Sequence, residues 1–239
     1  MLSPTSFHSF PTELIPQVEQ AVYRKIEDKL QALCNAGNDD TTTWTSSVYQ
    51  GLDDSRSYFE DLFQLSAGTL KSYGNRFENP ERLFDYTLRL WPEALLCSKT
   101  AIPTTPSRIG LILACESEWG NWKNEKLTCS KVMNDFWKLF DVKAAMKVLV
   151  YGCHIHSHPY DAKRLLDRFN HAINSATSIC GEAWLFIGIS PWEKVWNPQV
   201  HVLRSSQTSS VLSVPEWLNI TPQTILVGDQ SNNFTGHLA

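Results

Sequence analysis

Long apolar runs are missing from this sequence of 239 residues. The longest, at residues 109–115, has the length of a strand and falls far short of the roughly 20 apolar residues that span a membrane. Residues 1–10 contain no basic region followed by an apolar stretch, as a secretory signal peptide would. We therefore expect a cytoplasmic protein that does not enter a membrane.

Paired cysteines and glycine-rich phosphate loops are also missing. The six cysteines include no Cys-x-x-Cys pair, and in a cytosolic protein we expect them to stay reduced. The chain has no Gly-x-x-x-x-Gly-Lys-Ser/Thr loop, no Gly-x-Gly-x-x-Gly turn and no Gly-x-Ser-x-Gly elbow. P-loop NTPases, dinucleotide-binding enzymes and α/β-hydrolases thereby lose their main sequence support.

Charge is unevenly spread along the chain, whose formal net charge is −4. Residues 1–85 hold 7 Lys and Arg against 13 Asp and Glu, whereas residues 123–168 hold 9 against 5. A local positive surface beside an acidic metal site is what a phosphodiesterase needs. A set of ordinary solvated helix faces explains the same surplus equally well.

The hydrophobic pattern predicts an α/β (or α+β) fold with a mixed sheet flanked by helices. Steps of three and four between apolar residues indicate helices, and alternating or continuous apolar runs indicate strands. The expected helices are 12–33, 53–70, 130–143 and 161–176, and the expected strands are 82–91, 109–118, 147–151, 183–189 and 199–203. Segments 35–47, 92–107 and 120–128 are expected to be loops, and 74–80 a turn. We divide the chain into a helical segment (1–81), a core (82–206) and a tail (207–239).

Three carboxylates stand at positions that suit a metal site. Glu116 and Glu118 end the strand at 109–118, and their spacing of two puts both on one face. Two adjacent carboxylates repel each other, and a divalent cation relieves that repulsion. Asp85 adds a third carboxylate from the strand before, which could pair antiparallel with 109–118. Mg²⁺, which Mn²⁺ could replace, would suit such oxygen ligands.

The same stretch resembles the PD-(D/E)XK, or restriction-endonuclease-like, superfamily. The likeness rests on Leu-Phe-Asp85-Tyr, on residues 111–121 ending in Glu116-Ser-Glu118-Trp-Gly-Asn, on the following helix with Asp135 and Lys138, and on residues 147–151. It implies a restriction-endonuclease-like core and a Mg²⁺-dependent nuclease. Its expected substrate is nucleic acid, with DNA favoured over RNA. The resemblance also allows a homodimer. Asp85, Glu116 and Glu118 would be metal ligands.

The chain departs from the family pattern at one catalytic position, because Glu118 stands where the family has lysine. Glu118 could then be a further ligand or the base that orients the attacking water. Lys138 could replace the missing lysine, although a helical salt bridge with Asp135, three residues away, is favoured. A catalytically inactive binding or assembly module is the main alternative, and a carboxylate-pair glycosidase has less support.

Two further patterns remain open. His154, His156 and His158 alternate along an extended segment directly after Cys153, and this run could bind zinc, but no second ligand cluster accompanies it. Trp119, Trp122 and Trp137 flank the acidic residues in sequence and could stack on bases. Because the chain has nine tryptophans, packing in the core is the favoured role of all three.

Overall fold

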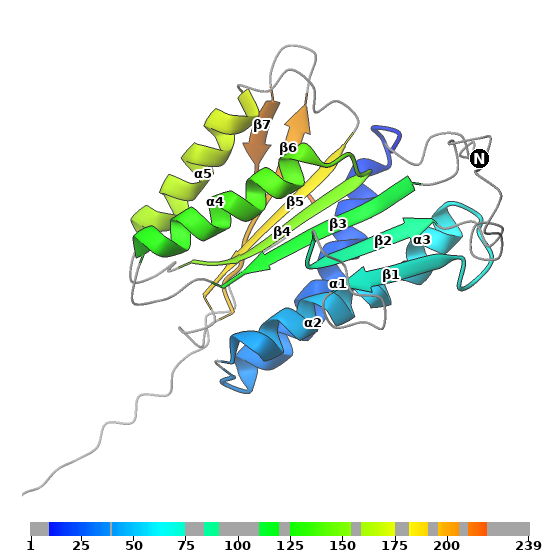
Figure 1. The fold of residues 1–239 in the computed structure, drawn as a ribbon, viewed down its shortest axis with the longest axis horizontal. Coiled ribbons are helices and arrows are strands. Elements are labelled where there is room, and N and C mark those ends of the chain that lie inside the picture. The colour runs from blue at the N-terminus through cyan, green and yellow to red at the C-terminus, as the bar shows by residue number, and fades with distance from the viewer. Residues whose placement is uncertain are drawn as a thin grey trace, which may run out of the picture.

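The computed structural model describes residues 10–38, 40–74, 84–90, 110–119, 125–153, 159–174, 182–190, 196–205 and 210–218. These residues form an α/β protein whose described part contains one open, mixed sheet of seven strands in the order β1-β2-β3-β4-β5-β6-β7 (Figure 1). The predicted class, a mixed sheet flanked by helices, is confirmed at this level.

The first 62 residues supply three helices, α1 (Ile15–Asn35), α2 (Thr41–Asp54) and α3 (Arg56–Leu62). The apolar stripe that predicted α1 is buried along its length, although the helix begins after Leu14 rather than at Thr12. The predicted loop at 35–47 is wrong from residue 41 onward. There the Asp40 carboxylate accepts hydrogen bonds from the backbone N–H groups of Thr42 and Thr43 and caps a helix. The single helix expected at 53–70 is also wrong, because α2 ends at Asp54 and α3 at Leu62.

Strands β1 (Leu70–Gly74), β2 (Tyr86–Leu90) and β3 (Gly110–Glu118) form an antiparallel meander. The predicted antiparallel pairing of β2 with β3 is confirmed, with Tyr86 opposite Cys115 at one end, but β2 begins one residue after Asp85, which was expected within the strand. The sequence did not predict β1, which lies in the segment 1–81 expected to be helical. The expected loop at 92–107 lies outside the described residues.

Strands β3, β4 (Met146–Gly152) and β5 (Ala183–Ile189) run parallel, and helices α4 (Glu125–Asp141) and α5 (Pro159–Asn174) connect them. Every residue of β4 and β5 is buried, as expected for parallel strands covered on both faces. Helix α4 begins at Glu125, so the expected loop at 120–128 is wrong over its last four residues. Antiparallel β6 (Gln199–Ser205) and β7 (Ser210–Ser213) close the sheet, and β7 extends it into the expected tail.

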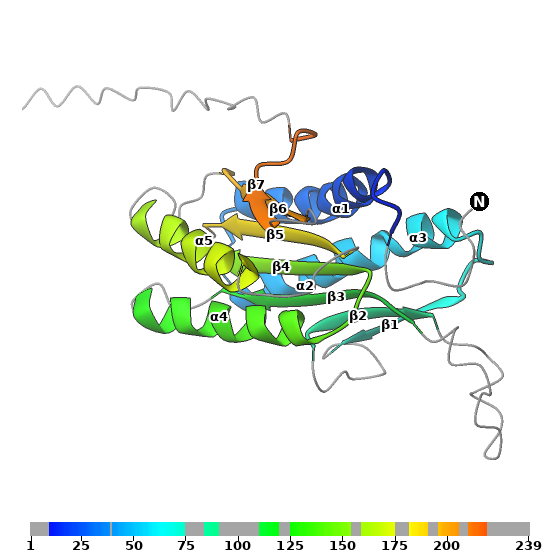
Figure 2. The ribbon, with the colours of Figure 1, turned by 90° about the horizontal axis from the view of Figure 1, so that it is seen from above.

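The helices cover the sheet from both sides, with α1 on one face and α4 and α5 on the other (Figure 2). One core cluster joins α1 and α2 to residues such as Cys115 and Val148, and the other joins α4 and α5 to Ala114 and Leu149. Neighbouring residues of β3 therefore face different layers. Among the described helices, none combines the length and apolar character needed to cross a membrane.

The contact between α1 and α2 depends on a glycine, and this gives a first testable consequence. A Cβ at Gly51 would lie 2.7 Å from the carbonyl oxygen of Lys25 and 2.9 Å from Cα of Ile26, so two backbones would have to separate. We predict that Gly51→Ala lowers the free energy of unfolding by about 1–3 kcal/mol in urea titrations. Gln50→Ala, one residue away on the exposed side of α2, should change it by no more than about 0.5 kcal/mol. Equal effects of the two substitutions would contradict this packing.

Candidate active site at the end of strand β3

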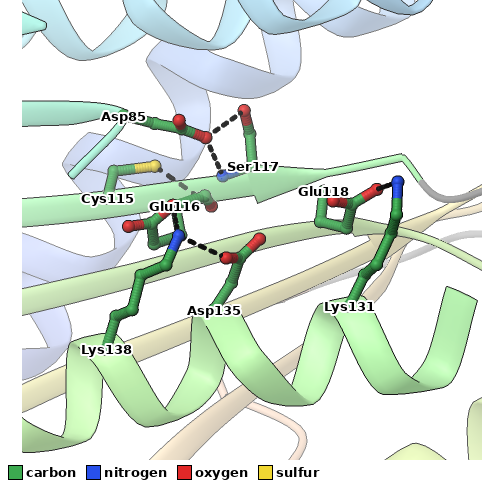
Figure 3. Close-up of polar contacts among 8 residues, drawn as sticks. All are labelled: Asp85, Cys115, Glu116, Ser117, Glu118, Lys131, Asp135 and Lys138. Carbon is green, nitrogen blue, oxygen red and sulfur yellow. Dashed lines mark hydrogen bonds and ion pairs between the residues drawn. The ribbon is translucent and has the colours of Figure 1, made fainter. Parts of the chain in front are cut away.

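Both glutamates at the end of β3 point toward helix α4 (Figure 3). Glu116 is 1% exposed, and Lys138 Nζ lies 3.5 Å from its Oε2 atom. Glu118 is partly exposed, and its Oε1 atom lies 3.9 Å from Lys131 Nζ. The spacing of two therefore places the pair on one face, as predicted, but each carboxylate meets a different lysine of α4.

Lys138 joins two acidic side chains. Besides its contact with Glu116, its Nζ lies 2.7 Å from Asp135 Oδ1, three residues earlier on α4. The salt bridge predicted from the sequence is confirmed, and it holds the ammonium beside Glu116 rather than away from it. Lys138 can therefore form the helical salt bridge with Asp135 and also act as a lysine of the site, two roles that were treated as alternatives from the sequence. These two carboxylates raise the pKa of Lys138 against the opposing effect of burial.

Asp85 lies immediately before β2 and is tied to the middle residue of the Glu-Ser-Glu sequence. Its Oδ2 atom accepts hydrogen bonds from the Ser117 backbone N–H, at 2.9 Å, and from the Ser117 hydroxyl, at 3.2 Å. The register of β2 with β3 begins at Tyr86, so the Asp85 carboxylate takes the place of a strand carbonyl for Ser117. In Figure 3, Asp85 and Ser117 lie on the other side of β3 from Asp135 and Lys138.

The electrostatics link Asp85, Glu116 and Asp135 across the strand. Burial, followed by the charges of Asp85 and Asp135, raises the pKa of Glu116 to about 9, against the opposing effect of Lys138. Burial and, more weakly, the charge of Asp85 also raise the pKa of Asp135, although Lys138 opposes the shift. The Oε1 atom of Glu116 is buried without a hydrogen-bond partner. The charged form of Glu116 is therefore disfavoured unless a cation joins it.

Tyr49 is a site residue that no sequence pattern singled out. It lies on α2, and burial, followed by the charge of Asp85, raises the pKa of its phenol, while a hydrogen bond with the Ser117 side chain opposes the shift. Its ring is also 6.1 Å from that of Tyr86. Tyr49 is therefore linked to Asp85 through Ser117, whose hydroxyl and backbone N–H both donate to the Asp85 carboxylate.

The described residues do not gather the three predicted carboxylates into one ligand group. In the described ranges, no three His, Cys, Asp or Glu side chains form a group that could hold a metal ion. Mg²⁺ often takes only one or two protein carboxylates, with water and substrate phosphate as the other ligands. Glu116, whose Oε1 atom is unpartnered, and Asp85, whose charge raises the pKa of Glu116, stay the two candidate ligands, although Asp85 lies on the other side of β3 from Lys138, the partner of Glu116 (Figure 3). Glu118 as a third ligand stays a prediction.

The other metal-ligand pattern is mostly outside the described residues. His154, His156 and His158 of the proposed zinc site cannot be placed for this reason. Cys153 is described, and it lies just after β4 with 3% of its surface exposed. Trp122 is likewise outside the described part, whereas Trp119 is buried and donates a hydrogen bond to Thr45 Oγ1 at 2.7 Å. Packing is thus the confirmed role of Trp119.

No protein-family model, curated protein or solved structure matches this chain. A function can therefore be inferred only from the fold and from the side chains of the site. They define an α/β protein with acidic and basic groups gathered at the end of a central strand, where the parallel part of the sheet begins.

The raised pKa of Glu116 predicts a stability that falls as the pH rises. An acid whose pKa is higher in the folded than in the unfolded state binds more protons when folded, so stability declines between the two values, from about 4.5 to about 9. Glu116→Gln removes this proton linkage. We predict that without divalent cations the variant is more stable than the wild type by on the order of 2 kcal/mol at pH 8, with little difference at pH 4.5.

Urea titrations between pH 4.5 and 9 in the presence of EDTA measure this difference. Glu13→Gln, at an exposed carboxylate just before α1, is the matched control and should follow the wild type at every pH. A Glu116→Gln variant that is less stable than the wild type across the range would show that Glu116 is charged and well stabilised in the folded protein.

Proposed function

We propose that this protein is a metal-dependent nuclease with a restriction-endonuclease-like core, which hydrolyses phosphodiester bonds in nucleic acid. One observation carries the proposal: a fully buried Glu116 carboxylate at the end of β3 is coupled to Asp85 and lies 3.5 Å from the ammonium group of Lys138. Structural salt bridges are usually placed at the surface, where hydration of the charges is retained. A buried acid with an unpartnered oxygen lowers stability, and such features concentrate at functional sites.

The order of elements supports the proposal. An aspartate at the start of β2, an acidic strand end on β3, helix α4 and buried parallel β4 follow one another in the order that the resemblance requires. Position 118, where the family has lysine, is a glutamate in this chain. An ammonium group is nevertheless present, because Lys138 on α4 contacts Glu116. This arrangement favours Lys138 over Glu118 as the basic partner of the site.

Each side chain has a separate role in the proposed reaction. Asp85 and Glu116 would hold Mg²⁺, which supplies an activated water and stabilises the charge that develops on the phosphate. Lys138 would bind the phosphate oxygen or orient the water beside Glu116, and Asp135 positions Lys138 through their 2.7 Å ion pair. Ser117, to which Tyr49 is linked, would hold Asp85 in place from the opposite side. Glu118 stays a candidate ligand or water-orienting base.

Cleavage assays on DNA and RNA substrates with Mg²⁺ or Mn²⁺ test this proposal. Asp85→Asn, Glu116→Gln and Lys138→Met each remove a charge while keeping the size of the side chain. We predict that each lowers the cleavage rate by at least about 100-fold. Glu13→Gln should cleave at the wild-type rate. Cleavage that persists unchanged in Glu116→Ala would exclude the proposed site.

A binding or assembly module with the same fold is the second candidate. Two observations favour it, namely the absence of a three-ligand group among the described residues and the use of Glu118 in an ion pair with Lys131. Calorimetric titration with Mn²⁺ separates the two functions. The nuclease predicts binding that Asp85→Asn and Glu116→Gln abolish, whereas the module predicts no titratable binding at this site.

A further inference from the structure

A groove lies between α4 and α5 on the outer surface of the molecule, away from Glu116. It has a volume of about 510 Å³ and is lined by Met133, Trp137, Arg164, Asp167, Arg168, His171 and Ala172. The lining therefore combines an aromatic ring and apolar side chains with two guanidinium groups, an imidazole and one carboxylate, that of Asp167. Trp137 precedes Lys138 on α4, so the edge of the groove adjoins the residue that reaches Glu116.

The layer of α4 and α5 carries the basic side of the molecule. Five basic side chains are exposed on these helices, namely Lys131, Lys138, Lys163, Arg164 and Arg168. Among the described side chains of the same helices, the exposed acidic ones are Asp141 and Asp167. Helix α1, which covers the other face of the sheet, holds three basic and three acidic residues and has no net charge (Figure 2). Because the exposed basic side chains of α4 and α5 outnumber the exposed acidic ones, a polyanion would be attracted to the side with the groove.

Trp137 is the exposed aromatic of this surface. It is 43% exposed, one of two large apolar side chains so exposed in the described part of the chain, so packing in the core is not its role. Phe136 and Phe140 contact the indole edge-to-face, each with ring centroids 5.2 Å apart. These contacts fix the orientation of the ring. An exposed aromatic ring of fixed orientation in a groove that is also lined by arginines is an arrangement by which proteins stack unpaired bases.

We propose that this groove binds single-stranded nucleic acid, with one base stacked on Trp137 and backbone phosphates on Arg164 and Arg168. A single strand is favoured over a duplex because a base must leave its own stack to reach an indole. The strand would continue across α4 toward Lys138, so the inference rests on the proposed nuclease function and deepens it by naming the substrate class. The apolar side chains of Met133 and Ala172 suit a base rather than free phosphate.

Fluorescence anisotropy with a labelled 12-nucleotide single strand tests the groove. The full chain is titrated in EDTA and low salt, so that binding is measured without cleavage. We predict that Trp137→Ala weakens binding about 10-fold and that Trp137→Phe restores most of the affinity. Arg164→Gln with Arg168→Gln should weaken binding to a similar extent and make the dependence on salt less steep. Lys25→Gln, at an exposed lysine of α1 on the other face, should bind as the wild type does.

Several outcomes would overturn the inference. Unchanged affinity in both groove variants, with melting temperatures equal to that of the wild type, would show that the strand binds elsewhere. Equal affinity for a duplex of the same length would exclude base stacking, and displacement by an acidic peptide at equal charge would indicate a peptide groove.

The inference and the proposed function fail separately. Asp85→Asn and Glu116→Gln are expected to bind the oligonucleotide as the wild type does, because their side chains do not line the groove. Binding that depends on the groove in a protein that never cleaves would support the groove and contradict the nuclease. Cleavage by groove variants at the wild-type rate on single strands, with undiminished binding, would contradict the groove and leave the nuclease in place.

Discussion

The burial of the Glu116 carboxylate is the constraint on which the rest of the site depends. Strand β3 lies in the middle of the sheet, so a side chain at position 116 is covered by α4 and flanked by β2 and β4. A carboxylate there loses most of its hydration and must either keep a proton or acquire positive charge. The surrounding groups supply only part of that charge, because one Lys138 ammonium is shared with Asp135. The fold therefore holds an acid whose charge is incompletely neutralised, which is the electrostatic condition that favours a cation.

The supporting contacts come from both layers of the molecule. On one side Asp135 fixes Lys138, and on the other Ser117, to which Tyr49 is linked, holds Asp85. The strand end thus connects the two helical layers, and its geometry depends on how closely α1 and α2 pack as well as on α4. The groove between α4 and α5 is also lined by residues of α4. Helix α4 would therefore both bind the substrate strand and carry Lys138 of the site.

Much of the fold could be predicted because it is encoded locally. The continuous apolar runs gave β3, β4 and β5, and the regular apolar stripes gave α1, α4 and α5 to within a few residues. Strands β1 and β7 escaped prediction because they are short and have few apolar residues to form a pattern. Helix α2 escaped because a run of threonines resembles a loop, whereas buried Trp44 and Val48 hold it in the core. For the same reason Tyr49 and the contact of Lys138 with Glu116 could not be predicted, since each depends on tertiary packing rather than on spacing.

A crystal structure with Mn²⁺ tests the central claim most directly, because the anomalous signal of manganese locates the ion independently of any activity. We expect a peak within coordination distance of the Glu116 Oε1 atom and of an Asp85 carboxylate oxygen, with Lys138 still paired to Asp135. A crystal at saturating Mn²⁺ with no peak at Glu116, or with the ion bound only at Glu118 or at the histidine run, would contradict the account.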